Sequence, residues 1–383
     1  MKKIIFTCDF LYNSEKQYFN TLSWIHKVFY PIINDAIENV NYSFGKICNN
    51  GIEFSRSEFF RLGGKNNLEE SYNIYDVKSF NDEQINYLKQ FFDKDTIVIG
   101  IELYRPLCDL LTSFDCKVID IAFHSYKLFD DLALGFATND IDVYNKILKY
   151  QISKEKFYYY ANYWKIFMQC NNMVDDKDLK DNSVLFIGQT LKDKSVAKDG
   201  KFLNVTDYTE KLKELSENYS EVYYLPHPYM RRNRQIVYNY IKESPYIKLI
   251  KNRSTYGLLS SDKISKVVGI STSVLYEAQY FNKEVEYLYK PLFNIDVPFE
   301  EYPYVSIFED YWNPKFWADI LAPICDIKQN VMDINHFKGS SNKLRNIRDL
   351  YWGYAQLDPI KRQPNLQDSV KNLYFDFLAL ISK

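Results

Sequence analysis

Short apolar runs bounded by polar residues recur along this 383-residue chain, and each predicts a strand buried on both faces. In the first half the runs are residues 4–8, 96–100 and 117–123. In the second half they are residues 184–187, 221–225, 247–250, 266–270 and 284–289. Apolar residues at helical spacing fill the intervals and predict helices at 14–40 (interrupted at Pro31), 82–92, 105–113, 207–218 and 235–242.

This alternation predicts an α/β fold with parallel sheets. The charged segment 173–182 is typical of a linker, so we expect a Rossmann-like domain at 1–178 and a second one at 179–312. A helical region at 313–383 is expected to pack across both. Two such domains facing a central cleft form the arrangement called GT-B. Residues 41–80 predict no clear elements.

Length and charge narrow the class of protein. The chain is long enough for two ordinary cores, with 46% hydrophobic and 17% aromatic residues. Its 48 basic and 50 acidic residues give a net charge of −2, whereas a nucleic-acid-binding protein usually has a basic excess. We therefore expect no nucleic-acid partner.

The cysteines and the N-terminal residues indicate in which cellular compartment the protein is expected. Six cysteines show no C-x-x-C pair and no histidine at zinc spacing, which is typical of reduced thiols in the cytoplasm. The apolar run after Lys2 and Lys3 is too short for a signal peptide, and no segment approaches a membrane span. A cytoplasmic protein is expected, with peripheral association at the cytoplasmic face of the inner membrane or in an assembly complex left open.

The loop after the strand 184–187 holds the first group of candidate site residues. In open α/β sheets, ligands bind outside the carboxyl ends of the strands. Gly188 is expected to let the backbone turn there. The polar residues that follow within the loop are Gln189, Thr190, Asp193, Lys194 and Ser195. For Asp193 alone, a helix N-cap or a solvated charge explains the residue equally well.

A second group follows the strand 266–270. Ser271, Thr272 and Ser273 stand where a helix is expected to begin, and its N–H groups and their hydroxyls suit a phosphate. Simple N-capping is the alternative. Glu277, one turn later, is a candidate contact for a nucleotide ribose or base, with a surface salt bridge as the alternative.

His227 lies between two prolines at the end of the strand 221–225, so a stiff loop presents its imidazole. A lone histidine is more often structural. We expect His227 and the Ser271 loop to end neighbouring strands. The arginines at 231, 232 and 234 suit either a phosphate or a solvated helix start.

Glu102 and His124 end adjacent strands of the first domain, so both are expected to line the cleft. A carboxylate there suits general acid or base catalysis, while capping or a salt bridge to Arg105 is the alternative. Asp140 and Asp142 match the D-x-D pattern of metal-dependent glycosyltransferases. They open a predicted helix, where the dipole favours acids, so we expect no metal site.

Several of these motifs resemble the bacterial β-Kdo transferases of capsule and O-antigen (lipopolysaccharide) assembly, and the similarity spans most of the chain from about Thr96. The motifs that carry the resemblance are Gly188-Gln-Thr-x-x-Asp193-x-Ser195, His227-Pro228, Ser271-x-Ser273-x-x-x-Glu277-Ala278, the segment 119–131, Phe316-Trp-Ala-Asp-Ile-Leu and Tyr351-Trp-Gly-Tyr354. The His-Pro and Ser motifs are shared with sialyltransferase-type enzymes that use CMP-sugars.

The resemblance implies a GT-B fold, a CMP-β-Kdo donor, retention at the anomeric carbon and no metal. It implies that Asp193 is the nucleophile and that His227, Ser271 and Ser273 contact the nucleotide. Glu102 occupies a suitable place for the acid/base. The acceptor, a glycan or lipid-linked oligosaccharide, is not identified, because the first part of the chain carries the least resemblance.

Two alternatives remain open at this point. The first is an inverting CMP-sialic-acid-type transferase, which needs a general base but no nucleophile. The second is a catalytically inactive GT-B module that binds a nucleotide or glycan in an assembly.

Overall fold

The computed structural model describes residues 2–11, 15–43, 48–49, 52–64, 79–124, 126–191, 193–228, 230, 234–251, 253–334 and 343–352. The chain divides into two compact units, and each is described by itself. Unit 1 comprises Met1–Ser125, Asp131–Ile152 and Phe293–Lys343. Unit 2 comprises Tyr126–Asp130, Ser153–Leu292 and Leu344–Lys383. The domains expected from the sequence run 1–178 and 179–312, whereas the chain passes between these units several times.

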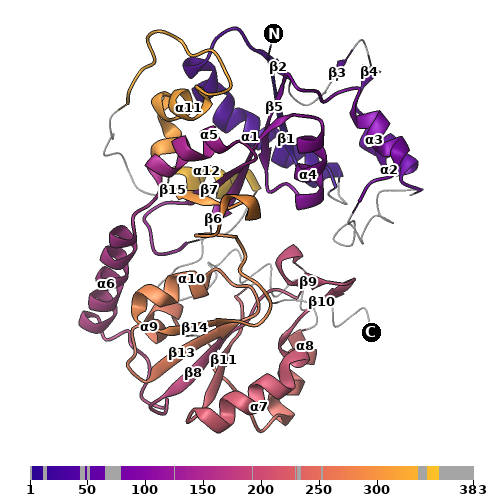
Figure 1. Ribbon diagram of the computed structural model, residues 1–383. Helices are drawn as coiled ribbons and strands as arrows, with labels where there is room; N and C mark the ends of the chain where they lie inside the picture. The colour runs from indigo at the N-terminus through magenta and orange to yellow at the C-terminus, as the bar shows by residue number, and fades with distance from the viewer. Residues whose placement is uncertain are drawn as a thin grey trace. The chain divides into compact units, whose positions relative to one another are not determined.

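Unit 1 is built on a mixed sheet whose strands lie in the order β15-β7-β6-β5-β1-β2 (Figure 1). Their bounds are β1 Lys3–Cys8, β2 Asn41–Ser43, β5 Thr96–Ile101, β6 Lys117–His124, β7 Ala133–Thr138 and β15 Val305–Ile307. Strands β2, β1, β5 and β6 are parallel. Strand β7 runs antiparallel to β6, and β15 runs antiparallel to β7. The central strands β1 and β5 are almost wholly buried, as their apolar runs predict.

The helices of unit 1 are α1 Glu15–Ala36, α2 Arg56–Leu62, α3 Asp82–Leu88, α4 Arg105–Ser113, α5 Ile141–Ile147 and α11 Pro314–Leu321; a small hairpin joins β3 Cys48–Asn49 to β4 Ile52–Glu53. The expected interruption of the first helix at Pro31 is wrong, because α1 continues through this proline. Helix α1 packs against β1 and α11 and buries Leu22, Ile25 and Phe29. This burial outweighs the backbone hydrogen bond that the proline removes.

Unit 2 contains a five-stranded parallel sheet in the order β12-β11-β8-β13-β14 (Figure 1). The strands are β8 Ser183–Ile187, β11 Val222–Leu225, β12 Lys248–Leu249, β13 Ile264–Gly269 and β14 Glu284–Tyr287. From β8 the chain adds β11 and β12 on one side, then returns to add β13 and β14 on the other. The strand order therefore reverses at β8 and β13.

The helices of unit 2 are α6 Lys154–Cys170, α7 Thr209–Asn218, α8 Arg234–Glu243, α9 Thr255–Leu259, α10 Val274–Ala278 and, from Leu344 onward, α12 Lys343–Trp352. Helix α7 packs on β11, α8 on β12, and α10 on β13 and β14. The described part of the unit also contains the 3-10 helices Lys194–Val196, Val205–Tyr208 and Gln279–Phe281 and the hairpin β9 Ala197–Lys198 with β10 Lys201–Phe202. One core cluster joins Val184 and Phe186 of β8 to Leu212 of α7 and Val237 of α8. It fixes the strand ends from which the loops leave.

The predicted α/β class is confirmed within each unit. The sheet of unit 2 is parallel throughout, as predicted, whereas the sheet of unit 1 adds the antiparallel strands β7 and β15 to its parallel strands. The GT-B placement of the units stays a prediction. The predicted strands at 96–100 and 184–187 match β5 and β8 within one residue, and the helix predicted at 105–113 is α4. Across the residues described, none of the helices combines the length and apolar character needed to cross a membrane.

Candidate functional site

The carboxyl edge of the unit 2 sheet brings together the loops that follow β8, β11 and β13 (Figure 1). In doubly wound sheets, ligands bind where the strand order reverses, because the loops diverge there and leave a crevice. Here that point lies between β8 and β13, which are directly paired, with Gly269 opposite Ile187. The loops that begin at Gly188 and Ser271 therefore flank the place where a ligand is expected.

Gln189 joins these two loops. Its side-chain Oε1 accepts a hydrogen bond of 2.7 Å from the Ser271 amide, and its Nε2 lies 3.5 Å from the Ser195 Oγ. Gly188 precedes it for reasons of space: a Cβ there would lie 2.5 Å from the Tyr224 hydroxyl. The expectation that Gly188 serves a turn is therefore incomplete, because close packing of β11 also demands glycine.

The three hydroxyl-bearing residues after β13, Ser271, Thr272 and Ser273, differ in their hydrogen bonding. Thr272 Oγ1 accepts from the Val274 amide at 3.3 Å, so this residue caps locally. Ser273 stands at the N-cap of α10 without a side-chain capping bond. Ser271 is fully buried, and its Oγ has no hydrogen-bond partner anywhere in the described chain. A buried hydroxyl without a partner costs free energy, so Ser271 is suited to a ligand acceptor that would satisfy it.

Asp193 is exposed and caps the 3-10 helix Lys194–Val196. Its Oδ1 accepts from the Ser195 amide at 2.9 Å. Within the described residues its Oδ2 accepts no hydrogen bond, so one carboxylate oxygen is available to a substrate. One carboxylate oxygen of Asp193 therefore has the capping role considered in the sequence analysis, and the other oxygen does not take part in the cap. Its role as a nucleophile stays a prediction.

Two lysines near this loop, Lys198 and Lys290, were not among the site residues predicted from the sequence. The ammonium of Lys290, just after β14, lies 5.1 Å from the ring centroid of Tyr289, and Lys198 approaches the same ring at 5.6 Å. Burial, followed by the charge of nearby Lys194, lowers the pKa of Lys290. The positive charges of Lys194 and Lys290 therefore influence each other. Lys290 was missed, although its position directly after a predicted strand was a usable signal.

His227 follows β11, and its carbonyl accepts from the Met230 amide at 3.0 Å, which tightens the loop. The expectation that His227 and the Ser271 loop end neighbouring strands is wrong, because β8 lies between β11 and β13. Sequence order does not reveal a reversal of strand order, which is the reason for this error. The arginines at 231 and 232, and the side chain of Arg234, lie outside the described residues.

Glu277 has a different environment from the one expected. Its carboxylate is 2% exposed, and Oε1 accepts from the amides of Lys127 and Leu128, at 2.7 and 3.0 Å, and from the Tyr256 hydroxyl at 3.0 Å. The neighbouring ring of Tyr276 stacks on Tyr126, which lies in the same segment as Lys127 and Leu128. Glu277 thus anchors residues 126–130 inside unit 2. Its burial rules out the surface salt bridge considered as the alternative, while a contact with a nucleotide stays a prediction.

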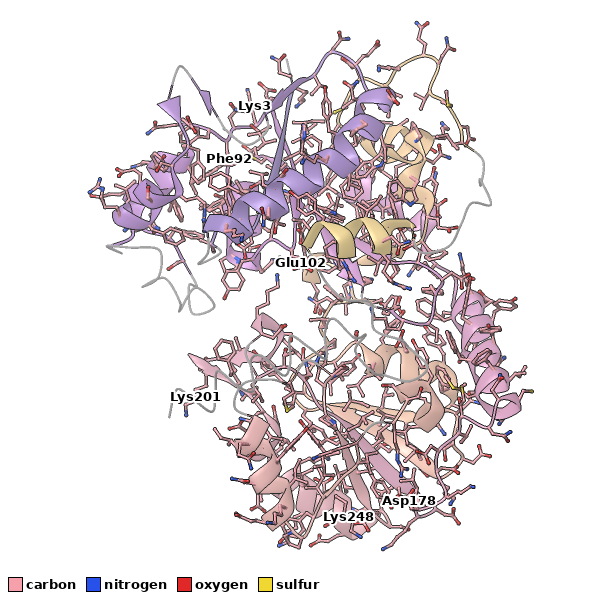
Figure 2. All side chains as sticks on the ribbon, turned by 180° about the vertical axis from the view of Figure 1, so that it is seen from behind. Lys3, Phe92, Glu102, Asp178, Lys201 and Lys248 are labelled. Atoms are coloured by element: carbon pink, nitrogen blue, oxygen red, sulfur yellow. The ribbon has the colours of Figure 1, made fainter. Side chains whose placement is uncertain are left out.

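In unit 1, Glu102 directly follows β5 and is labelled in Figure 2. This sheet also reverses its strand order, between β1 and β5, so Glu102 lies at its ligand-binding edge. Glu102 has a φ of 50°, a left-handed conformation that costs free energy in a residue with a Cβ, and its amide donates to Ile121 O at 2.8 Å. Because the units are described separately, the pairing of Glu102 with Asp193 stays a prediction.

Asp120 on β6 supports the Glu102 loop and was missed as a site residue. This buried carboxylate accepts from the Leu103 amide at 3.0 Å and from the Tyr304 hydroxyl. Burial, followed by the charge of Asp120, raises the pKa of Tyr304, so this hydroxyl stays protonated. An acidic residue in the middle of an apolar strand was the available signal.

His124, expected to line the cleft, lies inside unit 1. It is fully buried, and its Nδ1 lies 2.8 Å from Ser306 Oγ. Burial lowers the pKa of His124 to about 3, so the ring is neutral at ordinary pH. The packing is tight, since a Cβ at Gly135 would lie 2.1 Å from His124 Nε2. His124 is therefore packed within unit 1 and is not exposed to solvent, in contrast to the expectation that it lines a cleft.

Asp140 is the N-cap of α5, as its sequence position suggests. Its Oδ1 accepts from the Asp142 and Val143 amides, both at 3.0 Å, and its Oδ2 pairs with Lys117 at 2.7 Å. Burial opposes ionisation, yet these bonds lower the pKa of Asp140. No group of three metal-binding side chains occurs within the described ranges. Independence from metal nevertheless stays a prediction.

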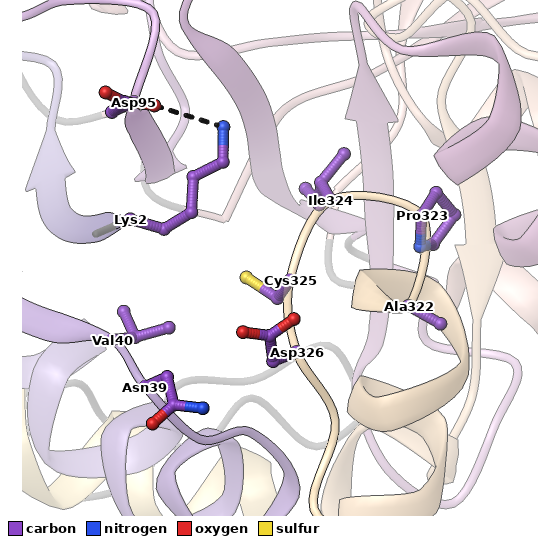
Figure 3. A pocket seen from close by; sticks show the side chains of 9 residues that line it. All are labelled: Lys2, Asn39, Val40, Asp95, Ala322, Pro323, Ile324, Cys325 and Asp326. Atoms are coloured by element: carbon purple, nitrogen blue, oxygen red, sulfur yellow. Dashed lines mark ion pairs between the residues drawn. The ribbon is translucent and has the colours of Figure 1, made fainter.

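A separate hollow of about 710 Å³ opens at the amino edge of the unit 1 sheet (Figure 3). It is lined by the Lys2–Asp95 ion pair at 3.5 Å, by Asn39 and by the segment 322–326. Burial raises the pKa of Cys325 in its wall to about 12, so this thiol is not a ready nucleophile. The hollow lies at the opposite end of the strands from Glu102 and contains none of the predicted site residues.

Comparison with known proteins gives only distant likenesses. No family model and no curated protein matches the chain. Two of the similar structures are of KpsC from Thermosulfurimonas dismutans, one of its beta Kdo 2,7 transferase and one of its beta Kdo 2,4 transferase. Each aligns over 92% of this chain at 13% identity and a TM-score of 0.37. The alignments cover 99% and 98% of the KpsC chains. The UDP-GlcNAc 2-epimerase of Methanocaldococcus jannaschii aligns over 92% of this chain and 100% of its own at 13% identity and a TM-score of 0.29. Scores at this level carry no argument about function.

Proposed function

We propose that the protein is a retaining glycosyltransferase that transfers Kdo from CMP-β-Kdo to a glycan or glycolipid by double displacement. The observation that carries the proposal is the buried, unpartnered Ser271 hydroxyl at the point where the unit 2 sheet reverses its strand order. The preceding sequence motifs, which resemble those of β-Kdo transferases, supply the choice of donor.

The phosphate of the CMP donor fits the Ser271 loop. The Ser271 and Ser273 hydroxyls would donate to phosphate oxygens, and Gln189 holds the Ser271 amide by a 2.7 Å hydrogen bond. His227 would reach the nucleotide from the far side of β8. Lys194 and Lys290 add positive charge, which suits a donor whose phosphate and sugar carboxylate are both anionic.

The reaction would proceed in two displacements at the anomeric carbon of Kdo. In the first, an Asp193 carboxylate oxygen bonds to this carbon while its bond to the CMP oxygen breaks, and CMP leaves with the electron pair. In the second, an acceptor hydroxyl attacks the same carbon, its proton passes to a base, and the bond to Asp193 breaks. Glu102 is the proposed base, because its loop lies at the ligand-binding edge of the unit 1 sheet.

The charge of the substrate makes the lysines relevant to this chemistry. Kdo carries a carboxylate on its anomeric carbon, so an attacking aspartate meets electrostatic repulsion. A lysine ammonium within a few ångströms offsets that repulsion, most strongly where water is excluded. Lys194, which follows Asp193 in sequence, is the proposed source of this charge.

Asp193 also supports a second candidate, an inverting CMP-sialic-acid-type transferase. Its capping bond to the Ser195 amide gives this aspartate a structural role that requires no covalent chemistry. An inactive binding module would retain the same loop. A donor screen separates the three: thermal unfolding and CMP release are measured with CMP-Kdo and with CMP-sialic acid.

Retaining Kdo transfer predicts that CMP-Kdo raises the melting temperature and is slowly hydrolysed, while CMP-sialic acid does neither. Stabilisation and turnover with CMP-sialic acid alone would favour the inverting enzyme. Binding without turnover of either donor would favour the inactive module.

A further inference from the structure

A second polar pocket lies in unit 2, at the opposite end of β13 from the Ser271 loop. Its volume is about 380 Å³, within the range of small-molecule sites. Its walls come from α6, the C-terminal end of α9, the start of β13 and the turn after the 3-10 helix Gln279–Phe281. These elements pack on one another, since α6 contacts both α9 and that 3-10 helix. The pocket is therefore part of a continuous fold.

Two lysines bring positive charge to this pocket. Lys165 of α6 and Lys283 both line it, and within the described residues neither forms an ion pair. Lys283 Nζ donates to the Ser261 carbonyl at 2.6 Å, which fixes its position. Lys165 Nζ lies 5.8 Å from the ring centroid of Phe281. Both ammonium groups thus keep hydrogen-bonding capacity for a ligand.

The charge balance of the pocket favours an anion. Asp262 is the one acidic residue among its lining residues, against the two lysines. Burial lowers the pKa of Lys283, Asp262 raises it, and the charge of Lys165 lowers it further. The two ammonium groups therefore repel each other. An anion placed between them would relieve this repulsion.

A buried hydroxyl completes the site. Ser260, at the C-cap of α9, lines the pocket and is 6% exposed. Its Oγ is buried and has no hydrogen-bond partner in the described part of the chain. The cost of such a group is recovered when a ligand oxygen accepts its proton. This hydroxyl is an observation independent of the lysines, and it indicates an oxygen-bearing ligand.

We propose that this pocket binds the phosphate group of a small phosphorylated molecule. The Lys165 and Lys283 ammonium groups and the Ser260 hydroxyl bind the phosphate oxygens, and Phe281 forms an apolar wall for the remainder of the ligand. None of these residues belongs to the Ser271 loop, and the two sites lie at opposite edges of one sheet. The proposal therefore stands or falls separately from the function proposed above.

The probe is inorganic phosphate added to the full-length protein, with sodium chloride at matched ionic strength to separate binding from screening. Calorimetry measures the affinity, and amide chemical shifts locate the ligand. We expect saturable binding, with shifts at residues 260–265 and 281–283. Lys165→Met should weaken this binding about tenfold or more, as loss of a hydrogen bond to a charged group predicts.

Lys165→Arg should retain most of the affinity, because the charge and donors remain. Lys154→Met, on an exposed position of the same helix, is the matched control and should bind phosphate like wild type. Ser260→Ala tests the site without removing charge and should weaken binding several-fold. Equal affinity in wild type, Lys165→Met and Ser260→Ala overturns the proposal. Shifts confined to residues 188–195 and 271–273 overturn it as well, since phosphate would then occupy only the other edge.

Discussion

The buried carboxylate of Glu277 makes the stability of unit 2 depend on pH. Burial raises the pKa of Glu277 from 4.5 to about 7, against the lowering effect of its bonds from Leu128, Tyr256 and Lys127. The folded protein therefore binds this proton more tightly than the unfolded chain does. The contribution of Glu277 to stability is fully present below pH 4.5 and is lost as pH rises through 7. Since one pKa unit corresponds to about 1.4 kcal/mol, ionisation costs the folded state about 3 kcal/mol.

Glu277→Gln tests this reasoning, because the amide oxygen can accept the same three hydrogen bonds and cannot ionise. Urea unfolding followed by tryptophan fluorescence between pH 4.5 and 8.5 gives the free energy of unfolding for both proteins. The stability of wild type relative to the variant should fall by about 3 kcal/mol across this range, with most of the fall between pH 4.5 and 7 and a plateau above pH 7. Glu214→Gln, on the exposed face of α7, is the control and should show no such trend. A difference between wild type and Glu277→Gln that does not change with pH would refute the argument.

Two further predictions concern the nucleotide and the metal. His227→Ala and Ser273→Ala should each weaken CMP binding about tenfold or more, because each removes a hydrogen bond to a charged ligand; unchanged affinities in calorimetry would contradict this assignment. Transfer should survive EDTA and the Asp142→Ala substitution, because Asp140 and Asp142 begin a helix. Loss of turnover that added magnesium or manganese restores would show that these aspartates bind a metal.

The edges of both sheets were predictable because local pattern determines them. Apolar runs identify β5 and β8, and in a parallel sheet the residues that follow such strands share one edge. That rule correctly placed Glu102, Asp193 and Ser271 beyond the carboxyl ends of β5, β8 and β13, while their roles in a site stay predictions. It did not identify which strand lies between two others, and so β8 was not expected between β11 and β13.

The environment of Glu277 depends on contacts that the local sequence does not contain. Its amide donors, Lys127 and Leu128, lie 150 and 149 residues earlier in the chain. Strand β15 has only three residues and joins the sheet of unit 1 through β7, far away in sequence. Tertiary packing determines such short strands and such distant partners. The pattern of apolar residues along the chain does not predict them. For the same reason, the sequence does not predict that the hydroxyls of Ser260 and Ser271 are buried without a hydrogen-bond partner among the described residues.

The central claim is that Asp193 forms a covalent bond to the sugar of a CMP-Kdo donor. The protein is incubated with CMP-Kdo without a productive acceptor, and intact-protein and peptide mass spectrometry follow. We expect an added mass of one Kdo on the peptide that contains Asp193, and no adduct on Asp193→Asn, which should still bind CMP. Transfer by Asp193→Asn at a rate near that of wild type would show that Asp193 is not the nucleophile.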